Sequence, residues 1–389
     1  MEQVNIIGVG MTRFGVLDES LEQLAAIAAT QARTDSQTLD SKFDYLFVGA
    51  QNPDEFANRG NVSTLLSDHL GLVPAGAAHI ETGPSSGASA FEIGFSFIAS
   101  GHADLVMVLG VEKMSGVDRN SVLRIINKMI SSESESHYGA TPAALAALMA
   151  RRYMHDYGLT RDDLSLVPVK AHRNGAKNPL AHFQKEITID DVKNSRIVAD
   201  PLTLYDCCPT SDGAAAAILA SNRLVKELEL KEQAVRVAGI SHATDYLAIQ
   251  HRQSLTSLSA TGLATDKAFR MADLQLSDID VFEVHDAFSI LEIINMEDLG
   301  LVERGKAINL IRDGTIEVTG DKPVNTMGGL KARGHPTGAS GVAQIHDLVL
   351  QLRGIAPKGL QVDDPHTALA HNIGGFGNNI IVSLLTKSS

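Results

Sequence analysis

Tryptophan is absent from this 389-residue chain, and its only two cysteines, Cys207 and Cys208, are adjacent. This excludes a disulfide framework and a cysteine zinc site, because both need several separated thiols. Basic residues are also scarce, since 33 Lys and Arg stand against 46 Asp and Glu, a net charge of −13. The balance argues against nucleic acid and anionic membranes as partners, because both attract a basic face.

Long apolar runs are missing as well. No uninterrupted apolar stretch reaches the roughly 18 residues that span a bilayer, and the N-terminus has no basic segment before a long apolar run. We therefore expect a soluble cytoplasmic protein without a signal peptide. The chain does have 44% hydrophobic residues, enough for a large core and, by length, about two or three domains.

Two passages about 230 residues apart share one order of elements. Each predicts an apolar strand, a helix, a second strand, a Gly/Pro turn that opens another helix, and two more apolar strands. The ranges are 4–9, 21–32, 45–48, 83–87, 88–100, 105–109 and 214–219, then 235–240, 264–272, 279–284, 334–338, 339–352, 367–370 and 379–385. Any α/β protein shows some echoes of this kind, but the matching order favours duplication. Apolar strands alternating with helices predict an α/β fold of two halves, 1–230 and 231–389, stacked as α/β/α/β/α.

Residues from about 115 to 200 interrupt the first half and have no counterpart in the second. Helices are predicted over 142–156 and 161–178, the second with Thr160 as its N-cap. Such an insertion commonly covers a ligand. Its cations form either a solvated helix face or a pocket for a phosphate-bearing ligand; they are Arg151, Arg152, Lys170, Arg173, Lys177 and Lys185.

Three of the 14 histidines fall at the ends of predicted strands or in glycine-bracketed turns. His285 and His371 each end a strand, and His335 begins the turn before the last long helix. Ligands of open α/β sheets gather at the carboxyl ends of strands. A structural hydrogen-bonding role is an equal alternative for each histidine alone, but the three together favour a site.

Metal and nicotinamide chemistry fit this pattern poorly. The three histidines lie on separate segments without a His-x-x-x-His helix, so we expect no metal. Gly-Val-Gly at 8–10 is followed by Met-Thr-Arg, which lacks the third glycine of a dinucleotide-binding turn. The glycines near 328 and 374 allow either tight turns or a close approach of backbone to a ligand.

Six motifs resemble those of the thiolase superfamily along nearly the whole chain, with a likeness to sterol-carrier-protein-type and archaeal acetoacetyl-CoA thiolases. They are Gly-Val-Glu-Lys-Met at 110–114, Cys-Pro-Thr-Ser-Asp-Gly-Ala-Ala-Ala at 208–216, His-Asp-Ala-Phe at 285–288, Asn-Thr-Met-Gly-Gly-Leu at 325–330, Gly-His-Pro-Thr-Gly-Ala-Ser-Gly at 334–341 and His-Asn-Ile-Gly-Gly at 371–375. The resemblance implies a duplicated five-layer fold, a helical loop domain (about 115–200) over coenzyme A, and a homodimer or tetramer. It also implies a zinc-ribbon/OB-fold partner protein.

The resemblance implies roles for single residues. His335 matches the histidine that activates the nucleophilic cysteine, and His285 matches the one that holds the thioester oxygen in an oxyanion hole. His371 stands in the last motif, where many thiolases place an acid/base cysteine. We expect the coenzyme A thioester, a substrate rather than a bound cofactor, to contact Gly375, Asn372 and Ser340.

The chain departs from the family at its nucleophile. By resemblance the cysteine falls three residues after Glu81 and three before Gly87, where this chain has Pro84. Proline has no nucleophilic atom, so standard thiolysis is doubtful. Ser85 is the nearest substitute, although a hydroxyl ionises far less readily than a thiol. Neither Cys207 nor Cys208 lies in the nucleophile's motif.

Three functions remain open. A carbon–carbon lyase of the aldolase type needs only a base, an oxyanion hole and a bound thioester enolate, with Tyr246 or Tyr205 as a candidate proton donor. An acetyl-CoA acetyltransferase with weak activity or an unrecognised nucleophile is the second. A non-catalytic subunit that binds coenzyme A is the third.

Overall fold

The computed structural model describes residues 2–388. The first half forms five strands in the order β3-β2-β4-β7-β1. Its elements are β1 (Val4–Met11), α1 (Leu21–Asp35), β2 (Tyr45–Gly49), α2 (Pro53–Ala57), α3 (Val62–His69), β3 (Gly76–Ile80), α4 (Ser86–Ala99), β4 (Leu105–Glu112), β7 (Gly213–Ser221) and α9 (Asn222–Glu227).

The second half repeats this plan with four strands in the order β8-β11-β10-β9. Its elements are β8 (Val235–Thr244), α10 (Ser259–Ala272), β9 (Val281–Val284), α11 (Ser289–Asp298), α12 (Ala307–Arg312), α13 (Ser340–Arg353), β10 (Thr367–Gly374) and β11 (Asn379–Lys387). The place of β3 is taken by a single parallel bridge between Phe282 and Val324.

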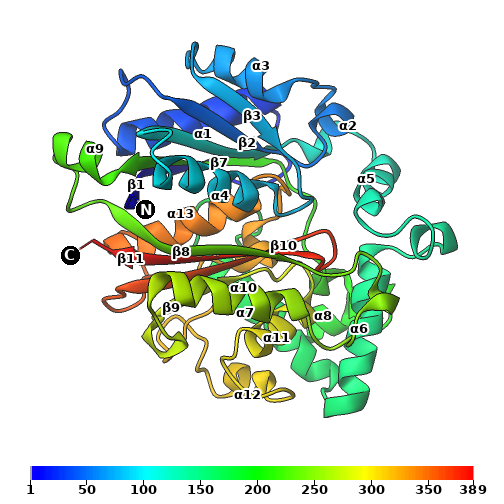
Figure 1. Cartoon of the computed structure of the whole chain (residues 1–389). Coiled ribbons are helices and arrows are strands. Elements are labelled where there is room, and N and C mark those ends of the chain that lie inside the picture. The colour runs from blue at the N-terminus through cyan, green and yellow to red at the C-terminus, as the bar shows by residue number, and fades with distance from the viewer. Residues whose placement is uncertain (1, 389) are drawn as a thin grey trace.

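The two halves stack in the predicted five layers (Figure 1), with α4 and α13 between the two strand layers. The layers are also joined at one edge, because Asn5 and Ile6 of β1 pair with Arg236 and Val235 of β8. The strands therefore form one continuous ladder of nine, whereas the sequence pattern alone predicts two separate sheets.

The starts of α4 and α13 approach each other closely at two glycines. A Cβ at Gly87 would collide with the carbonyl oxygen of Gly338, and a Cβ at Gly341 would collide with the backbone of Ala88. Glycine at these positions lets the two helix backbones touch. The starts of the two helices are thereby held side by side at the centre of the molecule.

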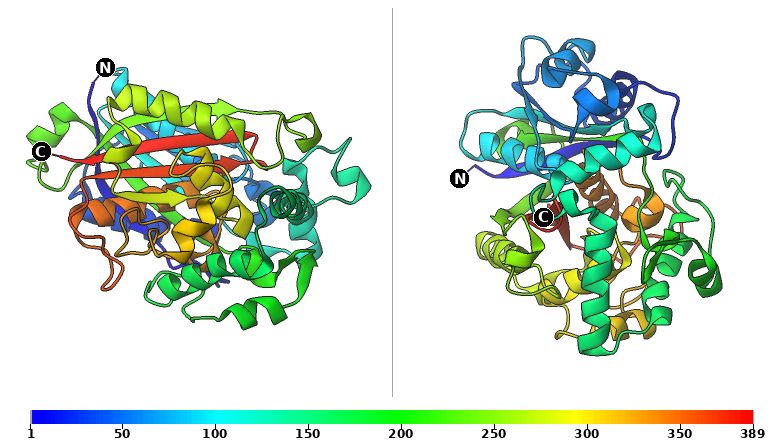
Figure 2. Two further views of the ribbon diagram at one scale, coloured as in Figure 1. Left: turned by 90° about the horizontal axis from the view of Figure 1, so that it is seen from below. Right: turned by 90° about the vertical axis from the view of Figure 1, so that its right-hand side faces the viewer.

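A helical loop domain enters between β4 and β7 and gathers on one side of the layered core (Figure 2). It contains α5 (Arg119–Ile126), α6 (Pro142–Tyr157), α7 (Arg161–Gly175), α8 (Ile189–Asn194) and the short strands β5 (Ile197–Ala199) and β6 (Leu202–Thr203). Thr160 caps α7 as predicted, and its hydroxyl and the Asp163 carboxylate satisfy each other's backbone N–H. Helices α6 and α7 pack against α11. No helix within residues 2–388 is long and apolar enough to cross a membrane.

Candidate active site

His285 and His335 meet at the centre of the molecule. His285 directly follows β9, and His335 lies in the turn before α13. Their rings are 5.0 Å apart between centroids and nearly perpendicular. Both residues are buried, with 2% and 6% of their surface exposed, so most water is kept from the two imidazoles.

The hydrogen bonds of His335 fix its tautomer. The Ser340 hydroxyl donates to the carbonyl oxygen of Pro336 at 2.8 Å, so it must accept from Nδ1 of His335, 2.6 Å away. Nε2 then carries a lone pair, and it makes no hydrogen bond within the described chain. Burial, followed by the nearby Arg333 charge, lowers the pKa of His335 to about 3. The ring is neutral at physiological pH and Nε2 is available as a base.

His285 has the opposite tautomer. The backbone N–H of Ile373 donates to its Nδ1 at 3.3 Å, and the amide of Asn372 approaches the same nitrogen at 3.4 Å. Nδ1 is therefore the acceptor and Nε2 carries the hydrogen. Burial, followed by repulsion between the protonated forms of His285 and its neighbours His335 and His371, lowers the pKa of His285 well below its usual value. A neutral imidazole that can donate through Nε2 thus lies beside one that can accept through Nε2.

Asn372 supports this arrangement. Its side-chain amide donates to Oε1 of Gln344 on α13 at 2.7 Å, which links β10 to α13 beside the histidine pair. Its own Oδ1 is buried without a partner in residues 2–388. Asn372 and Ser340, expected to contact the substrate, are in this structure the polar neighbours of His285 and His335.

His371 lies apart from the pair. Successive residues of a strand point to opposite faces, and while Asn372 faces α13, His371 faces α10, where its Nε2 lies 3.0 Å from the Thr261 hydroxyl. Burial alone lowers the pKa of His371 to about 3. Its side chain therefore hydrogen-bonds on the α10 side of the strand, and a role for His371 in the site stays a prediction.

Pro84 occupies a tight turn between β3 and α4. Its side chain is buried, and the preceding Gly83 has φ +65°, which glycine adopts without strain. A Cβ on Gly83 would lie 2.9 Å from the backbone nitrogen of Gly375. Gly375, expected to contact the substrate, therefore packs against the turn that holds Pro84.

The serines of this turn bond within it. Ser85 donates to the carbonyl oxygen of Thr82 at 2.9 Å, and Ser86 donates to that of Gly83 at 2.6 Å. In the described part of the chain neither hydroxyl is hydrogen-bonded to His335. The expectation that Ser85 could be activated by His335 finds no support in this geometry.

Two other groups considered from the sequence are poorly suited to reaction. Burial raises the pKa of the Cys207 thiol to about 11 and that of Cys208 to about 12, so both remain protonated. Tyr246 is 62% exposed and packs against His251, and Tyr205 packs against His172. Neither tyrosine has a contact with the histidine pair among residues 2–388.

Four of the six cations of the insertion form ion pairs. Arg151 pairs with Asp200, Arg152 with Asp156, and Arg173 with Glu317. Lys170 is buried against Glu292 at 2.9 Å. These four cations are held in separate ion pairs, whereas Arg173 and Lys177 also line one hollow. A phosphate pocket on the insertion stays a prediction.

The buried carboxylate of Glu112 accepts hydrogen bonds from both halves of the chain beside the site. Its carboxylate accepts from the backbone N–H of Gln51 at 2.6 Å, from the Thr337 hydroxyl at 3.0 Å and from Gly338 N–H at 3.0 Å. Burial raises the pKa of Glu112 to about 7 despite these bonds. Glu112 therefore links the turn before α13 to the first half. Its motif at 110–114 was recognisable in the sequence, but its hydrogen-bond partners could be identified only from the structure.

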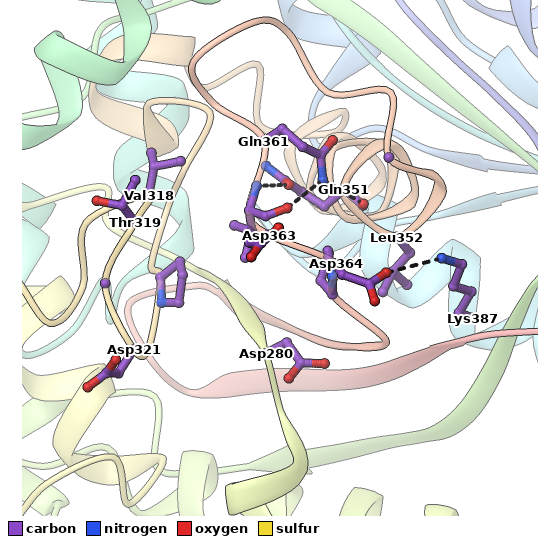
Figure 3. A pocket seen from close by; sticks show the side chains of 15 residues that line it. Asp280, Val318, Thr319, Asp321, Gln351, Leu352, Gln361, Asp363, Asp364 and Lys387 are labelled. Atoms are coloured by element: carbon purple, nitrogen blue, oxygen red, sulfur yellow. Dashed lines mark hydrogen bonds and ion pairs between the residues drawn. The ribbon is translucent and has the colours of Figure 1, made fainter.

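A cavity of about 720 Å³ lies away from the histidines (Figure 3). Asp280 lines it at the start of β9, whereas His285 follows the end of the same strand. Asp363 and Asp364 also line it, and Asp364 is 3.6 Å from Lys387. This acidic hollow and the histidine pair are at opposite ends of β9.

Comparison with known proteins now identifies the family. The thiolase N-terminal domain model matches residues 4–223, and the thiolase C-terminal domain-like model matches residues 241–387. The chain belongs to the thiolase family. It is 40% identical to an acetyl-CoA acetyltransferase of Methanothermobacter thermautotrophicus over all of both chains. It is 34% identical to sterol carrier protein 2 of Bos taurus, covering 98% of this chain and 72% of that one.

Solved structures agree with this assignment. The Ltp2-ChsH2(DUF35) aldolase superposes with a TM-score of 0.86 at 26% identity, covering 100% of this thiolase-family chain and 98% of that one. An acetyl-CoA acetyltransferase from Syntrophomonas wolfei has the same fold, with a TM-score of 0.78 at 19% identity over 100% of both chains. The chain therefore has the thiolase fold, and its relatives include proteins named acetyl-CoA acetyltransferase.

Proposed function

We propose that this thiolase-family protein cleaves, or in reverse forms, the bond between Cα and Cβ of a 3-hydroxyacyl-CoA thioester by an aldol route. The observation that carries the proposal is the facing pair of neutral histidines with opposite tautomers. His335 offers a lone pair on Nε2 and His285 offers an N–H. These are a base and an oxyanion donor, the two groups that aldol chemistry requires.

The steps follow from these two atoms. Nε2 of His335 takes the proton of the 3-hydroxyl, the Cα–Cβ bond breaks, and the oxygen left on Cβ becomes a ketone or aldehyde. The electron pair moves into the thioester as an enolate, whose oxygen accepts the Nε2–H of His285. His335 then returns its proton to Cα, which yields the shortened acyl-CoA and restores both rings.

Thiolysis requires a nucleophile that these residues do not supply. By resemblance its position is that of Pro84, which has no reactive atom. Ser85 is bonded to Thr82, and burial raises the pKa of both cysteine thiols. An aldol route forms no acyl-enzyme and avoids this requirement.

The similarity to relatives supports two candidates. The likeness to an aldolase structure favours the aldol route. The full-length likeness to an archaeal acetyl-CoA acetyltransferase favours the alternative, acetyl transfer through a nucleophile still to be located. A non-catalytic subunit is less favoured, because a scaffold has no need for a matched base and donor.

We further propose a coenzyme A thioester as substrate with no bound cofactor, a homodimer or tetramer, and a zinc-ribbon/OB-fold partner. The partner is supported by the aldolase relative, whose description includes a DUF35 protein. The division into halves at 1–230 and 231–389, with a loop domain at about 115–200, belongs to the same proposal.

One experiment separates the candidates. The purified protein is given acetoacetyl-CoA with free CoA, and separately a 3-hydroxyacyl-CoA with a branched Cβ, while CoA products are followed by chromatography. We expect cleavage of the second substrate only, and no acetyl adduct in the intact mass after incubation with acetyl-CoA. Thiolysis with a turnover of about 1–1000 per second would reject the aldol proposal in favour of acetyl transfer.

A further inference from the structure

Arg252 is a half-buried cation without a carboxylate partner. It lies in the 245–258 loop between β8 and α10. Its Nε donates to the carbonyl oxygen of Tyr246 at 3.1 Å and its Nη2 to that of Leu247 at 3.3 Å. Nη1 donates no hydrogen bond in the chain from 2 to 388, and no carboxylate there is at ion-pair distance from the guanidinium. The charges of Asp245 and Glu135 act on the guanidinium from nearby, but no anion contacts Nη1, where a bound anion would gain a charge-assisted hydrogen bond.

The acids near Arg252 are already engaged. Asp245 accepts hydrogen bonds from the backbone of Tyr246 at 2.7 Å and from the Ser259 hydroxyl at 2.5 Å. Glu135 accepts from two backbone N–H groups, those of Ser131 and Ile249, each at 2.8 Å. Neither carboxylate forms an ion pair with the guanidinium, whereas Asp156 and Glu317 pair with arginines of α6 and α7.

The free end of Arg252 points at the turn that borders the histidine pair. Nη1 is 3.1 Å from the position of a Cβ on Gly377. Phe376, the preceding residue, packs against Phe288 with ring centroids 6.2 Å apart. Phe288 follows His285 by three residues. Gly375, which touches the Pro84 turn, is two residues from Gly377, at most about 7 Å along the chain. Arg252 therefore lies beside the turn that joins β10 to β11, and the same turn touches the Pro84 turn through Gly375.

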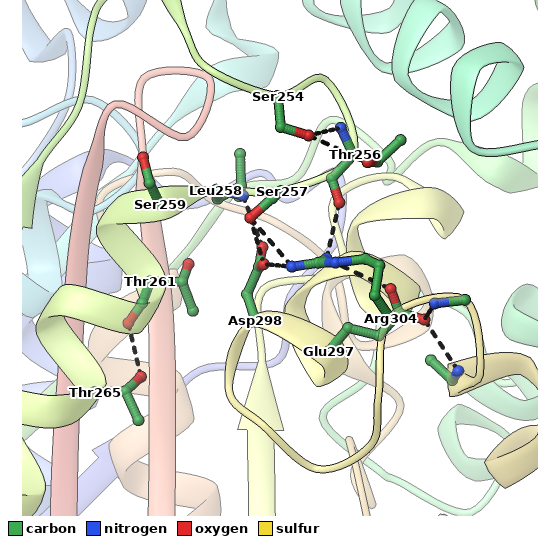
Figure 4. A network of polar contacts seen from close by, with 12 residues as sticks. Ser254, Thr256, Ser257, Leu258, Ser259, Thr261, Thr265, Glu297, Asp298 and Arg304 are labelled. Atoms are coloured by element: carbon green, nitrogen blue, oxygen red, sulfur yellow. Dashed lines mark hydrogen bonds and ion pairs between the residues drawn. The ribbon is translucent and has the colours of Figure 1, made fainter. Parts of the chain in front are cut away.

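The loop that carries Arg252 is fixed at its far end (Figure 4). Arg304 donates to the carbonyl oxygen of Thr256 at 2.8 Å and pairs with Asp298. Asp298 in turn accepts the Leu258 backbone N–H at 2.7 Å. Because the loop is held in this way, the guanidinium is positioned before a ligand binds, which lowers the ordering cost of binding.

We propose that Arg252 binds a carboxylate on the acyl part of the substrate, which makes the substrate class the CoA thioesters of dicarboxylic acids. This inference rests on the proposed function, because it places the acyl group at the histidine pair. The phosphates of coenzyme A share the anionic chemistry, but the long pantetheine arm separates them from the reacting carbons. The short path from Gly375 to Gly377 therefore favours the acyl carboxylate.

Binding without turnover tests this proposal independently of the aldol reaction. The affinities of glutaryl-CoA, its methyl ester and free CoA are measured by calorimetry for the wild type, R252Q and R252K. We expect the wild type to prefer glutaryl-CoA over the ester by roughly 10- to 100-fold, the worth of a hydrogen bond to a charged group. R252Q should lose the preference while its affinity for the ester stays unchanged, and R252K should retain part of it.

The control is R223Q, which removes an exposed arginine of α9 that pairs with Asp104; we expect it to keep the full preference. Equal affinity of the wild type for glutaryl-CoA and its ester would overturn the proposal. A loss of affinity for free CoA in R252Q, with both acyl thioesters weakened equally, would also overturn it by assigning Arg252 to a phosphate. Melting temperatures of the variants verify folding. A protein that shows the preference but no aldol activity would reject only the proposed function.

Discussion

The turns that open α4 and α13 occupy matching places in the two halves, and their backbones touch. In the first, Pro84 is buried and the hydroxyls of Ser85 and Ser86 bond to the turn's own carbonyls. In the second, His335 keeps Nε2 free and uses only Nδ1 for support from Ser340. The two halves thus have equivalent helix starts. We call the turn with His335 the open turn, because it presents a reactive atom, and the turn with Pro84 the closed turn, because it presents none. Substitutions at the two turns should have very different effects on chemistry.

The largest effect is expected at the open turn. His335→Gln removes the base, so the retro-aldol rate should fall by about 10²–10⁴-fold, measured as kcat with a 3-hydroxyacyl-CoA. His366→Gln, which changes an exposed histidine, is the control and should react at the wild-type rate. A His335→Gln protein within a few-fold of wild type would show that the open turn is not the reactive one.

The second largest effect on kcat is expected at the hydrogen-bond donor His285. His285→Ala removes the N–H that holds the enolate oxygen, and loss of one such donor costs about 10²–10³ in kcat. Because the donor acts mainly in the transition state, kcat should fall more than KM rises. A change confined to KM would indicate that His285 binds substrate without stabilising the enolate.

The closed turn gives the sharpest contrast. Pro84→Cys puts a thiol where the family resemblance places the nucleophile, and we expect acetyl-CoA to acylate it, detected as an adduct by intact mass spectrometry. Pro84→Ala should remain unmodified. A folded Pro84→Cys protein without adduct would mean that the geometry of the turn, and not only the missing thiol, prevents acylation.

The support of His335 should matter less than His335 itself. Ser340→Ala removes the acceptor for Nδ1–H, so part of the population shifts to the tautomer that lacks the Nε2 lone pair. We expect kcat to fall about tenfold, the worth of one hydrogen bond of about 1.4 kcal/mol. Ser340→Thr keeps the hydroxyl and should restore most of the rate, which a purely steric role would not predict.

The smallest effect concerns His371, which faces away from both turns. Its pKa is lowered to about 3 in the folded protein, against about 6.5 when unfolded. The unfolded state binds more protons between these values, so the free energy of unfolding falls as pH drops from about 6.5 towards 3. His371→Gln should make that decline shallower in urea titrations at pH 7 and pH 5; an unchanged slope would contradict the assignment.

Much of the fold was predictable from sequence, because apolar strands and amphipathic helices have distinct periods. Among the strands of the two halves, β3 was not predicted, because none of its residues is fully buried and an edge strand of this kind lacks the apolar run that marks the others. The loop domain's α7 ends at Gly175 rather than at 178. The residue at which this helix ends depends on the geometry of the following turn, and the spacing of hydrophobic residues does not predict it.

The site was predictable only in part. His285 and His335 stand at a strand end and a helix start, places where open sheets gather ligands. The separation of His371 depends on strand alternation relative to Asn372, and the tautomers depend on hydrogen bonds between residues far apart in sequence, such as His285 with Ile373. The hydrogen bond of Arg304 to Thr256 in the 245–258 loop also joins residues far apart in sequence and was not predicted.

The contact of α4 with α13 through Gly87 and Gly341 has a consequence for how this protein could change over generations. Because backbone meets backbone there, drift among the surrounding core side chains leaves the spacing of the two helix starts untouched. On the proposed function, a single replacement at position 84 would change the reaction while His335 keeps its place. The contact thus keeps the spacing of the two helix starts constant while residues in the turns change, so the chemistry can vary without a change of fold.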